Sequence, residues 1–201
     1  MVSENPQNTP GAAQDILPAP ASEKKHMTLL PQKTVEQVKE DTKKYLQEMD
    51  LEITREFDDD DICGFWIKFG DFPVLVENRK PLHYCVVALQ ITFSDETIIR
   101  TLNDYYEKQD HRFIFRLTQV LTSPQTSFVR VVEGGRVIGF TIMKSIYPFH
   151  HEFSIRDLDL AVQAVVSIGA VGIAFLKSEM GQMVLDHTPP RPVSEPGLMY
   201  E

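Results

Sequence analysis

The residues best suited to chemistry in this sequence are a histidine and a cysteine two positions apart. His83 and Cys85 lie in a run that predicts a β-strand over 83–93, so both side chains would share one face of it. Imidazole and thiolate groups bind zinc, and this pair would supply half of a tetrahedral site. Because no second pair of ligands is visible, we expect ordinary core residues here and no metal.

A second group of polar residues follows the last predicted hairpin. His150, His151 and Glu152 are consecutive in a predicted loop, and imidazole and carboxylate groups are the usual general acids and bases. Adjacent histidines point in different directions, and one neighbouring acid does not complete a catalytic site. We therefore expect an exposed loop with no catalytic residue and no bound cofactor.

Four consecutive carboxylates, Asp58 to Asp61, form a third candidate. A calcium-binding loop of the EF-hand type needs spaced ligands and a glycine at the turn, and this run has neither. The run instead predicts a solvated hairpin tip whose charges repel one another.

The composition limits which kinds of partner and which cellular compartment are expected. The chain has 201 residues with 29 acidic and 20 basic side chains, a formal net charge of −9. Such a balance repels phosphate backbones, so we expect no nucleic-acid partner. Two cysteines make no disulfide framework, and no basic stretch followed by an apolar run opens the chain, so we expect a cytoplasmic protein without a signal peptide.

Proline marks two tails around a single domain. Residues 1–31 hold four prolines before Pro31, and residues 187–201 hold four more. Because these stretches lack a periodic apolar pattern, we expect both tails to be disordered, the second one rich in proline. Met27 is an alternative start residue. The domain itself is predicted to cover 32–186.

Local patterns within that domain predict an α+β fold. Thr34 and Gln37 form a capping box at the start of a helix, and short connections between strands force antiparallel pairing. Gly134 and Gly135 suit a two-residue hairpin turn. The predicted order is a helix ending at Asp50, strands 51–57, 64–69, 73–78 and 83–93, a split helix capped by Ser94 and ending before Ser123, two strands around the glycine pair, and a final helix.

That final helix contains the most apolar stretch of the chain, the uncharged residues 160–176. Asp157 and Asp159 precede it directly, and seventeen residues reach only ~25 Å, less than a hydrocarbon core of ~30 Å. We therefore expect a core helix and no membrane span. A stripe of small residues would face the sheet: Ala161, Ala164, Ser167, Ala170 and Ala174. The first helix or a second copy of the protein would cover the other side, and a partner would contact the larger residues Val162, Val166, Ile173 and Phe175.

The layout resembles that of the YbjN-like proteins and of the wider Tir-chaperone-like, or type III secretion chaperone-like, fold. The stretches that carry the resemblance are YLQEMDLEITREFDDDD, WIKFGDFPVLVEN, VVALQITFSDE and VVEGGRVIGFTI. The resemblance implies an antiparallel sheet flanked by helices, a tendency to dimerise, and work as a chaperone-like or regulatory binding protein. It transfers no site residues, because these families share no active site.

The sequence thus predicts a non-enzymatic protein-binding module, a chaperone-like protein or a regulatory adaptor. A protein or peptide partner would bind along an exposed sheet edge or in an apolar groove beside a helix, and a homodimer is one form of this. The alternative is a small enzyme or ligand sensor whose pocket uses His83 and Cys85, or His150 and His151.

Overall fold

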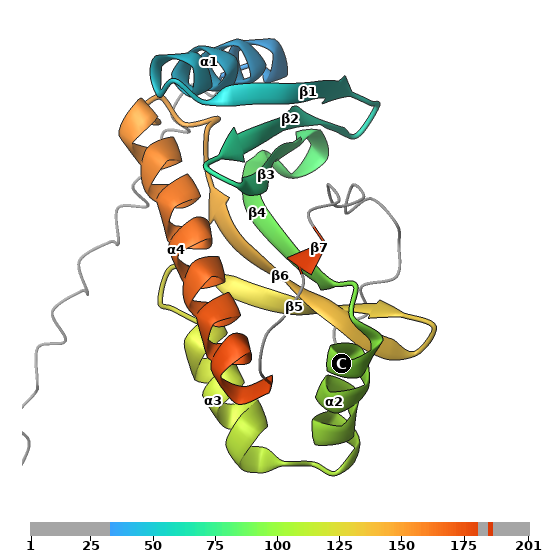
Figure 1. Ribbon diagram of the computed structural model, residues 1–201. Helices are drawn as coiled ribbons and strands as arrows, with labels where there is room; N and C mark the ends of the chain where they lie inside the picture. The colour runs from blue at the N-terminus through green and yellow to red at the C-terminus, as the bar shows by residue number, and fades with distance from the viewer. Residues whose placement is uncertain (1–32, 181–184, 187–201) are drawn as a thin grey trace, which may run out of the picture.

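The computed structural model describes residues 33–180 and 185–186, so the two predicted tails lie outside the described residues. The helices and strands follow the predicted order, and the short elements η1 and β7 are additional (Figure 1). The elements are α1 (Val35–Glu48), β1 (Glu52–Asp58), β2 (Ile62–Phe69), β3 (Phe72–Arg79), the 3₁₀ turn η1 (Lys80–Leu82), β4 (Tyr84–Phe93), α2 (Glu96–Glu107), α3 (His111–Leu121), β5 (Ser127–Glu133), β6 (Arg136–Ile146), α4 (Ile155–Met180) and β7 (Leu185–Asp186).

The strands form one antiparallel sheet in the order β1-β2-β3-β4-β6-β5. β1 to β4 follow one another as a meander, and the β5–β6 hairpin returns so that β6 pairs with β4. The short β7 pairs with the end of β4, at Thr92 and Phe93. The fold is therefore α+β, as the sequence predicts, with β4 in the interior of the sheet.

The local signals at the ends of elements are confirmed, with one shift. Thr34 and Gln37 form both hydrogen bonds of the capping box. Gly134 and Gly135 have φ angles of 57° and 78°, which suit the type I′ turn between β5 and β6. The helix after β4 is capped by the side chain of Asp95 and not by that of Ser94, because the Asp95 carboxylate accepts the Thr97 N–H at 2.8 Å.

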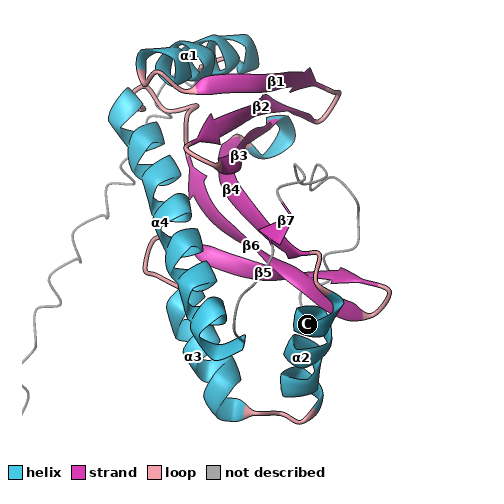
Figure 2. Cartoon of the chain, in the orientation of Figure 1, coloured by secondary structure: helices cyan, strands magenta, loops and turns pink. Residues whose placement is uncertain are grey.

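The main core lies between the helices and one face of the sheet, which we call the first face. It includes Phe65 of β2, Val76 of β3 and Leu89 of β4, together with the buried side chains of α2, α3 and α4. Figure 2 shows α4 running along the sheet, with α1 at one end and α2 and α3 at the other.

In its middle, helix α4 approaches the sheet through Gly169 and not through the predicted stripe of small residues. A Cβ atom on Gly169 would lie 2.3 Å from Leu89 Cδ2, so no other residue fits there without movement. Of the predicted stripe, Ala161 is buried in the main core and Ala164 is half-buried, but Ser167, Ala170 and Ala174 are exposed. The stripe prediction was wrong for the last three residues because, on a helix with apolar residues on nearly every side, periodicity does not tell which side faces the sheet.

Length and composition alone would allow α4 to cross a membrane. It has 26 residues with a mean hydropathy of 1.9 over its most apolar window, and 44% of that window is buried within the protein. A core helix of a soluble protein meets the same criterion. In the structure α4 packs on β4 and β6, and its sides contact α1 and α3.

Candidate protein-binding surfaces

His83 and Cys85 do not share a strand face. His83 precedes β4 in the left-handed conformation, with φ 52°, and its ring lies against Phe149 with centroids 5.1 Å apart. Cys85 is buried in the core, and burial, together with the nearby Glu77 and Cys63, raises the pKa of its thiol well above the ordinary value. A neutral thiol is a poor nucleophile and a poor metal ligand.

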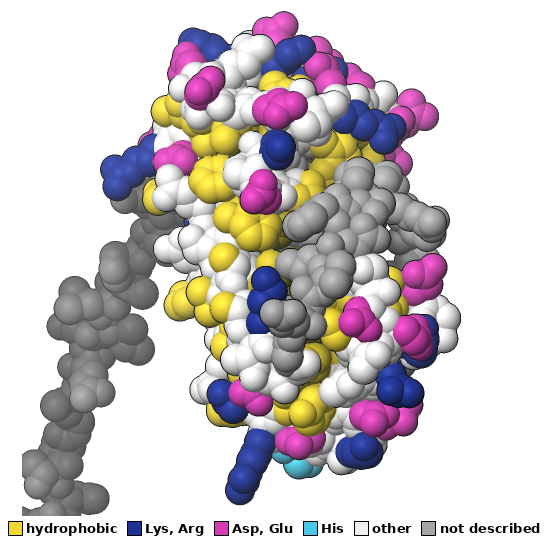
Figure 3. All heavy atoms as spheres, viewed as in Figure 1, with side chains coloured by type: hydrophobic (Ala, Val, Ile, Leu, Met, Phe, Trp, Pro, Cys, Tyr) yellow, Lys and Arg dark blue, Asp and Glu magenta, His cyan; other side chains and the backbone are white. Residues whose placement is uncertain are grey.

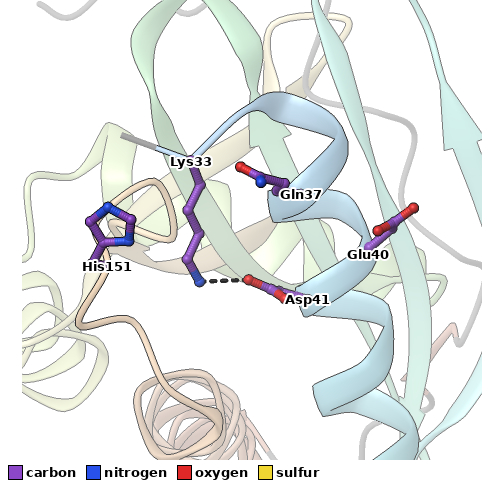
Figure 4. A pocket seen from close by; sticks show the side chains of 5 residues that line it. All are labelled: Lys33, Gln37, Glu40, Asp41 and His151. Atoms are coloured by element: carbon purple, nitrogen blue, oxygen red, sulfur yellow. Dashed lines mark hydrogen bonds and ion pairs between the residues drawn. The ribbon is translucent and has the colours of Figure 1, made fainter. Parts of the chain in front are cut away.

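The loop residues His150 and His151 are exposed at the protein surface, and each has different neighbours. The His150 ring meets Tyr147 edge-on at 6.3 Å. His151 lines a shallow hollow of about 200 Å³ beside α1, and Figure 4 shows it on the opposite side of Lys33 from Asp41. The Lys33 ammonium pairs with the Asp41 carboxylate at 2.5 Å. Within the described residues, no three His, Cys, Asp or Glu side chains gather as a metal site would require.

Lysines pair with the first aspartate of the acidic run, Asp58, whereas Asp59, Asp60 and Asp61 are exposed, as in the predicted solvated tip. Asp58 accepts hydrogen bonds from Lys39 at 2.8 Å and from Lys80 at 2.7 Å. Lys39 and Lys43 also pair with Glu56 of β1. These contacts lower the pKa of Asp58, through Lys39 and then Lys80. Figure 3 shows the resulting mixture of acidic and basic side chains over α1 and the adjoining end of the sheet.

This cluster should stabilise the fold above pH 4 and cease to do so in acid. The folded-state pKa values of Asp58 and Glu56 lie below their ordinary values of 3.8 and 4.5, so the gain is present above those values and is lost as pH falls through the lower ones. Because these groups are exposed, each pair contributes only about 0.2 to 1 kcal/mol. Urea unfolding of wild type and Lys39→Met should differ at pH 6, differ less at pH 3, and differ less in high salt. A difference independent of pH would contradict this account.

The residues of α4 that the sequence assigns to a partner lie mainly inside the protein. Val162, Val166 and Ile173 belong to the main core. Phe175 is half-buried, with its ring 5.9 Å from that of Phe113 and beneath the Arg116 guanidinium. Intramolecular contacts already occupy these four side chains, so a partner surface has to be sought elsewhere.

One edge strand of the sheet, β1, has charged residues and a β-bulge, features that oppose pairing with another strand. Four of its seven residues are charged: Glu52, Arg55, Glu56 and Asp58. Its pairing with β2 shifts register between Ile53 and Arg55, which leaves Thr54 as a bulge. Charges and bulges on an edge strand oppose the addition of a further strand.

The opposite edge, β5, lacks most of these devices. Its only charged residues are Arg130 and Glu133, and the register shift in the β5–β6 pair leaves its extra residue, Ile138, on β6. Val132 is 56% exposed. Within the described part of the chain, β5 pairs with β6 alone, and no other backbone hydrogen bond involves residues 127–133. α2 approaches β5 at the first face, where Arg130 lies over the Tyr106 ring.

The second face of the sheet is also apolar. Trp66, Leu75, Val86 and Ala88 form a separate buried cluster, flanked by the half-buried Phe57, Tyr84 and Met143. Every one of these residues belongs to a strand. The buried apolar side chains of α2, α3 and α4, and Leu46 of α1, belong to the main core on the first face. The sequence indicates that both faces of β4 are apolar, but it does not indicate what covers this one.

No family model and no curated protein matches the chain. Among solved structures, an uncharacterized protein from Methanothermobacter thermautotrophicus is similar, with a TM-score of 0.60 and 14% sequence identity. The match covers 72% of this chain and 99% of that one. At such low identity the similarity concerns the fold alone, so the arrangement of helices around an antiparallel sheet is one that this archaeal protein shares.

Proposed function

We propose that this chain is a non-enzymatic protein-binding module that takes up an extended segment of a partner as an additional strand along β5. The observation that supports the proposal is the contrast between the two sheet edges. β1 is charged, bulged and flanked by ion pairs to α1, whereas β5 is regular and mainly uncharged.

Strand addition draws its affinity from the main chain. A peptide that aligns with β5 forms hydrogen bonds with those backbone groups that do not pair with β6 in the described structure, and alternate side chains of the peptide decide specificity. Val129 and Val131 are half-buried on the second face and Val132 is exposed, so an apolar side chain of the peptide finds neighbours there. Apolar, β-branched segments are therefore the expected partners.

A second copy of the chain is a special case of such a partner, because two β5 strands can pair antiparallel across a twofold axis. A chaperone-like or adaptor role in the cytoplasm belongs to the same proposal. The alternative of a small enzyme gains no support from the described residues, since His83 and Cys85 face different surroundings and the Cys85 thiol is neutral.

Replacing Val132 by lysine should weaken the binding of a peptide strand along β5. Peptides selected from a random displayed library against the full chain are expected to bind Val132→Lys at least about tenfold more weakly, a loss of ~1.4 kcal/mol. The reason is that a charged side chain on the edge opposes a neighbouring strand. Fluorescence anisotropy of a labelled selected peptide measures the change, with thermal unfolding as the check that the variant folds.

Leu82→Lys is the matched control, because Leu82 is 60% exposed on η1, away from β5. Peptides that bind wild type and Val132→Lys equally well would refute the β5 edge as the binding site. A double variant with His150→Ala and His151→Ala should bind like wild type, and a loss of binding there would favour the loop histidines instead.

A further inference from the structure

We propose that the C-terminal segment, residues 187–201, folds back over the second face of the sheet and covers Trp66. This surface differs from the β5 edge, so the two proposals stand or fall separately. The starting observation is that Trp66 is 5% exposed and Leu75 is 1% exposed, although their cluster contains strand residues only. Bare side chains of this kind on an open sheet face would cost about 1.5 to 3 kcal/mol each.

The position of β7 directs the chain toward this surface. Leu185 pairs with Phe93, and Asp186 pairs with Thr92, so β7 itself runs along β4 in the direction of Leu89. There β3 already occupies the same edge of β4, because Val74 pairs with Leu89. A strand that continued beyond β7 would meet β3 within about three residues and has to leave the plane of the sheet.

The sequence changes at the same point. Pro189 and Pro190 follow Asp186 by three and four residues, and proline has no N–H with which to continue a strand ladder. On the first face α4 blocks the way, since Gly169 lies against Leu89 and Ile91. The second face, where no described helix packs, is the side that remains open to the chain.

The length and the composition of the segment 187–201 suit a path across the second face to Trp66. Fifteen residues in an extended, proline-rich conformation reach about 45 Å, whereas Trp66 lies two strands from β4, about 10 Å away. Proline-rich segments bind surfaces lined by aromatic rings, and Trp66, Tyr84 and Phe57 supply such rings.

A buried charge adds a second point of complementarity. Glu77 belongs to the same face, beside Val86 in the neighbouring strand, and its side chain is 2% exposed. Its Oε1 accepts a hydrogen bond from Arg79, but its Oε2 has no partner in the described structure. Arg191 is the one arginine of the segment 187–201, which has no lysine. An arginine delivered to this carboxylate would satisfy the remaining oxygen.

Trp66 is the only tryptophan of the chain, so its fluorescence tests the proposal in the full-length protein. A nitroxide label on Ser194→Cys should quench Trp66, whereas the same label on Ser3→Cys should not. Cys63 and Cys85 are buried and free, so the reagent is expected to leave wild type unlabelled, which is the control. The quenching should not depend on protein concentration, because the contact lies within one molecule.

Truncation after Asp186 provides a second measurement. Emission of Trp66 should shift to the red and acrylamide should quench it more steeply, and a synthetic peptide of residues 187–201 should reverse both changes. Circular dichroism shows whether the truncated chain is folded; if it is not, the labelled full chain decides. Absence of quenching from position 194, stronger quenching from position 3, or quenching that grows with concentration would each overturn the proposal, the last two by naming the N-terminal segment or a second copy as the cover.

Discussion

An aspartate in place of Val165 is expected to destabilise the protein severely, whereas an aspartate in place of Val171 should change its stability little. Both valines lie on α4, but Val165 is fully buried in the main core and Val171 is 54% exposed. An uncompensated charge in a core costs about 3 to 5 kcal/mol, a large part of a typical total stability of about 5 to 15 kcal/mol. Urea unfolding followed by circular dichroism measures both variants.

The Val171→Asp variant also distinguishes a core helix from a membrane-spanning helix. Val171 is close to the middle of α4, where a membrane-spanning helix would lose about 2.5 to 3.5 kcal/mol of insertion energy on gaining an aspartate. Flotation of wild type and Val171→Asp with lipid vesicles provides the comparison. Wild type that floats, together with Val171→Asp that does not, would contradict the packing of α4 on the sheet as its working state.

Signals that act within a few residues could be predicted from the sequence. The Thr34 capping box needs only Gln37, and the β5–β6 turn needs only Gly134 and Gly135, so both follow from local backbone chemistry. The break between α2 and α3 is of the same kind: Gln109 has a φ of 50°, and the Asp110 side chain caps α3.

The side of a helix that faces the sheet depends on residues distant in the chain and could not be predicted from the sequence. Residues around the whole girth of α4 are apolar, so the choice between the alanine stripe and the Gly169 side was made by Leu89 and Ile91, eighty residues or so away in the chain. The error at His83 has a closer cause. Pro81 favours the 3₁₀ turn η1, after which His83 turns into the left-handed region and β4 begins one residue later.

The same distinction between local signals and distant contacts applies to the candidate surfaces. The apolar character of both faces of β4 could be predicted from alternate residues, but the separation of Trp66 and Val86 from the helices depends on all four helices choosing the first face. The pairing of β6 with β4 makes β5 an edge strand. No local pattern encodes that pairing, because the two strands are separated by α2 and α3.

Replacement of Phe140 by alanine should lower the free energy of unfolding by about 3 to 5 kcal/mol. Phe140 lies on β6, is fully buried, and meets Phe93 of β4 and Phe128 of β5 edge-on, at 6.2 Å and 6.0 Å between ring centroids. Its loss therefore removes contacts to two neighbouring strands and leaves a cavity between them. Urea unfolding measures the change.

Phe115→Ala is the matched control, because this α3 side chain is 61% exposed and its loss should change the stability by no more than about 0.5 kcal/mol. Since Phe128 belongs to β5, Phe140→Ala should also accelerate amide hydrogen exchange in β5 more than in β1. A loosened β5 is a poorer template for an added strand, so the same variant should bind a β5-directed peptide more weakly. Equal exchange at both edges would show that Phe140 does not hold β5 in place.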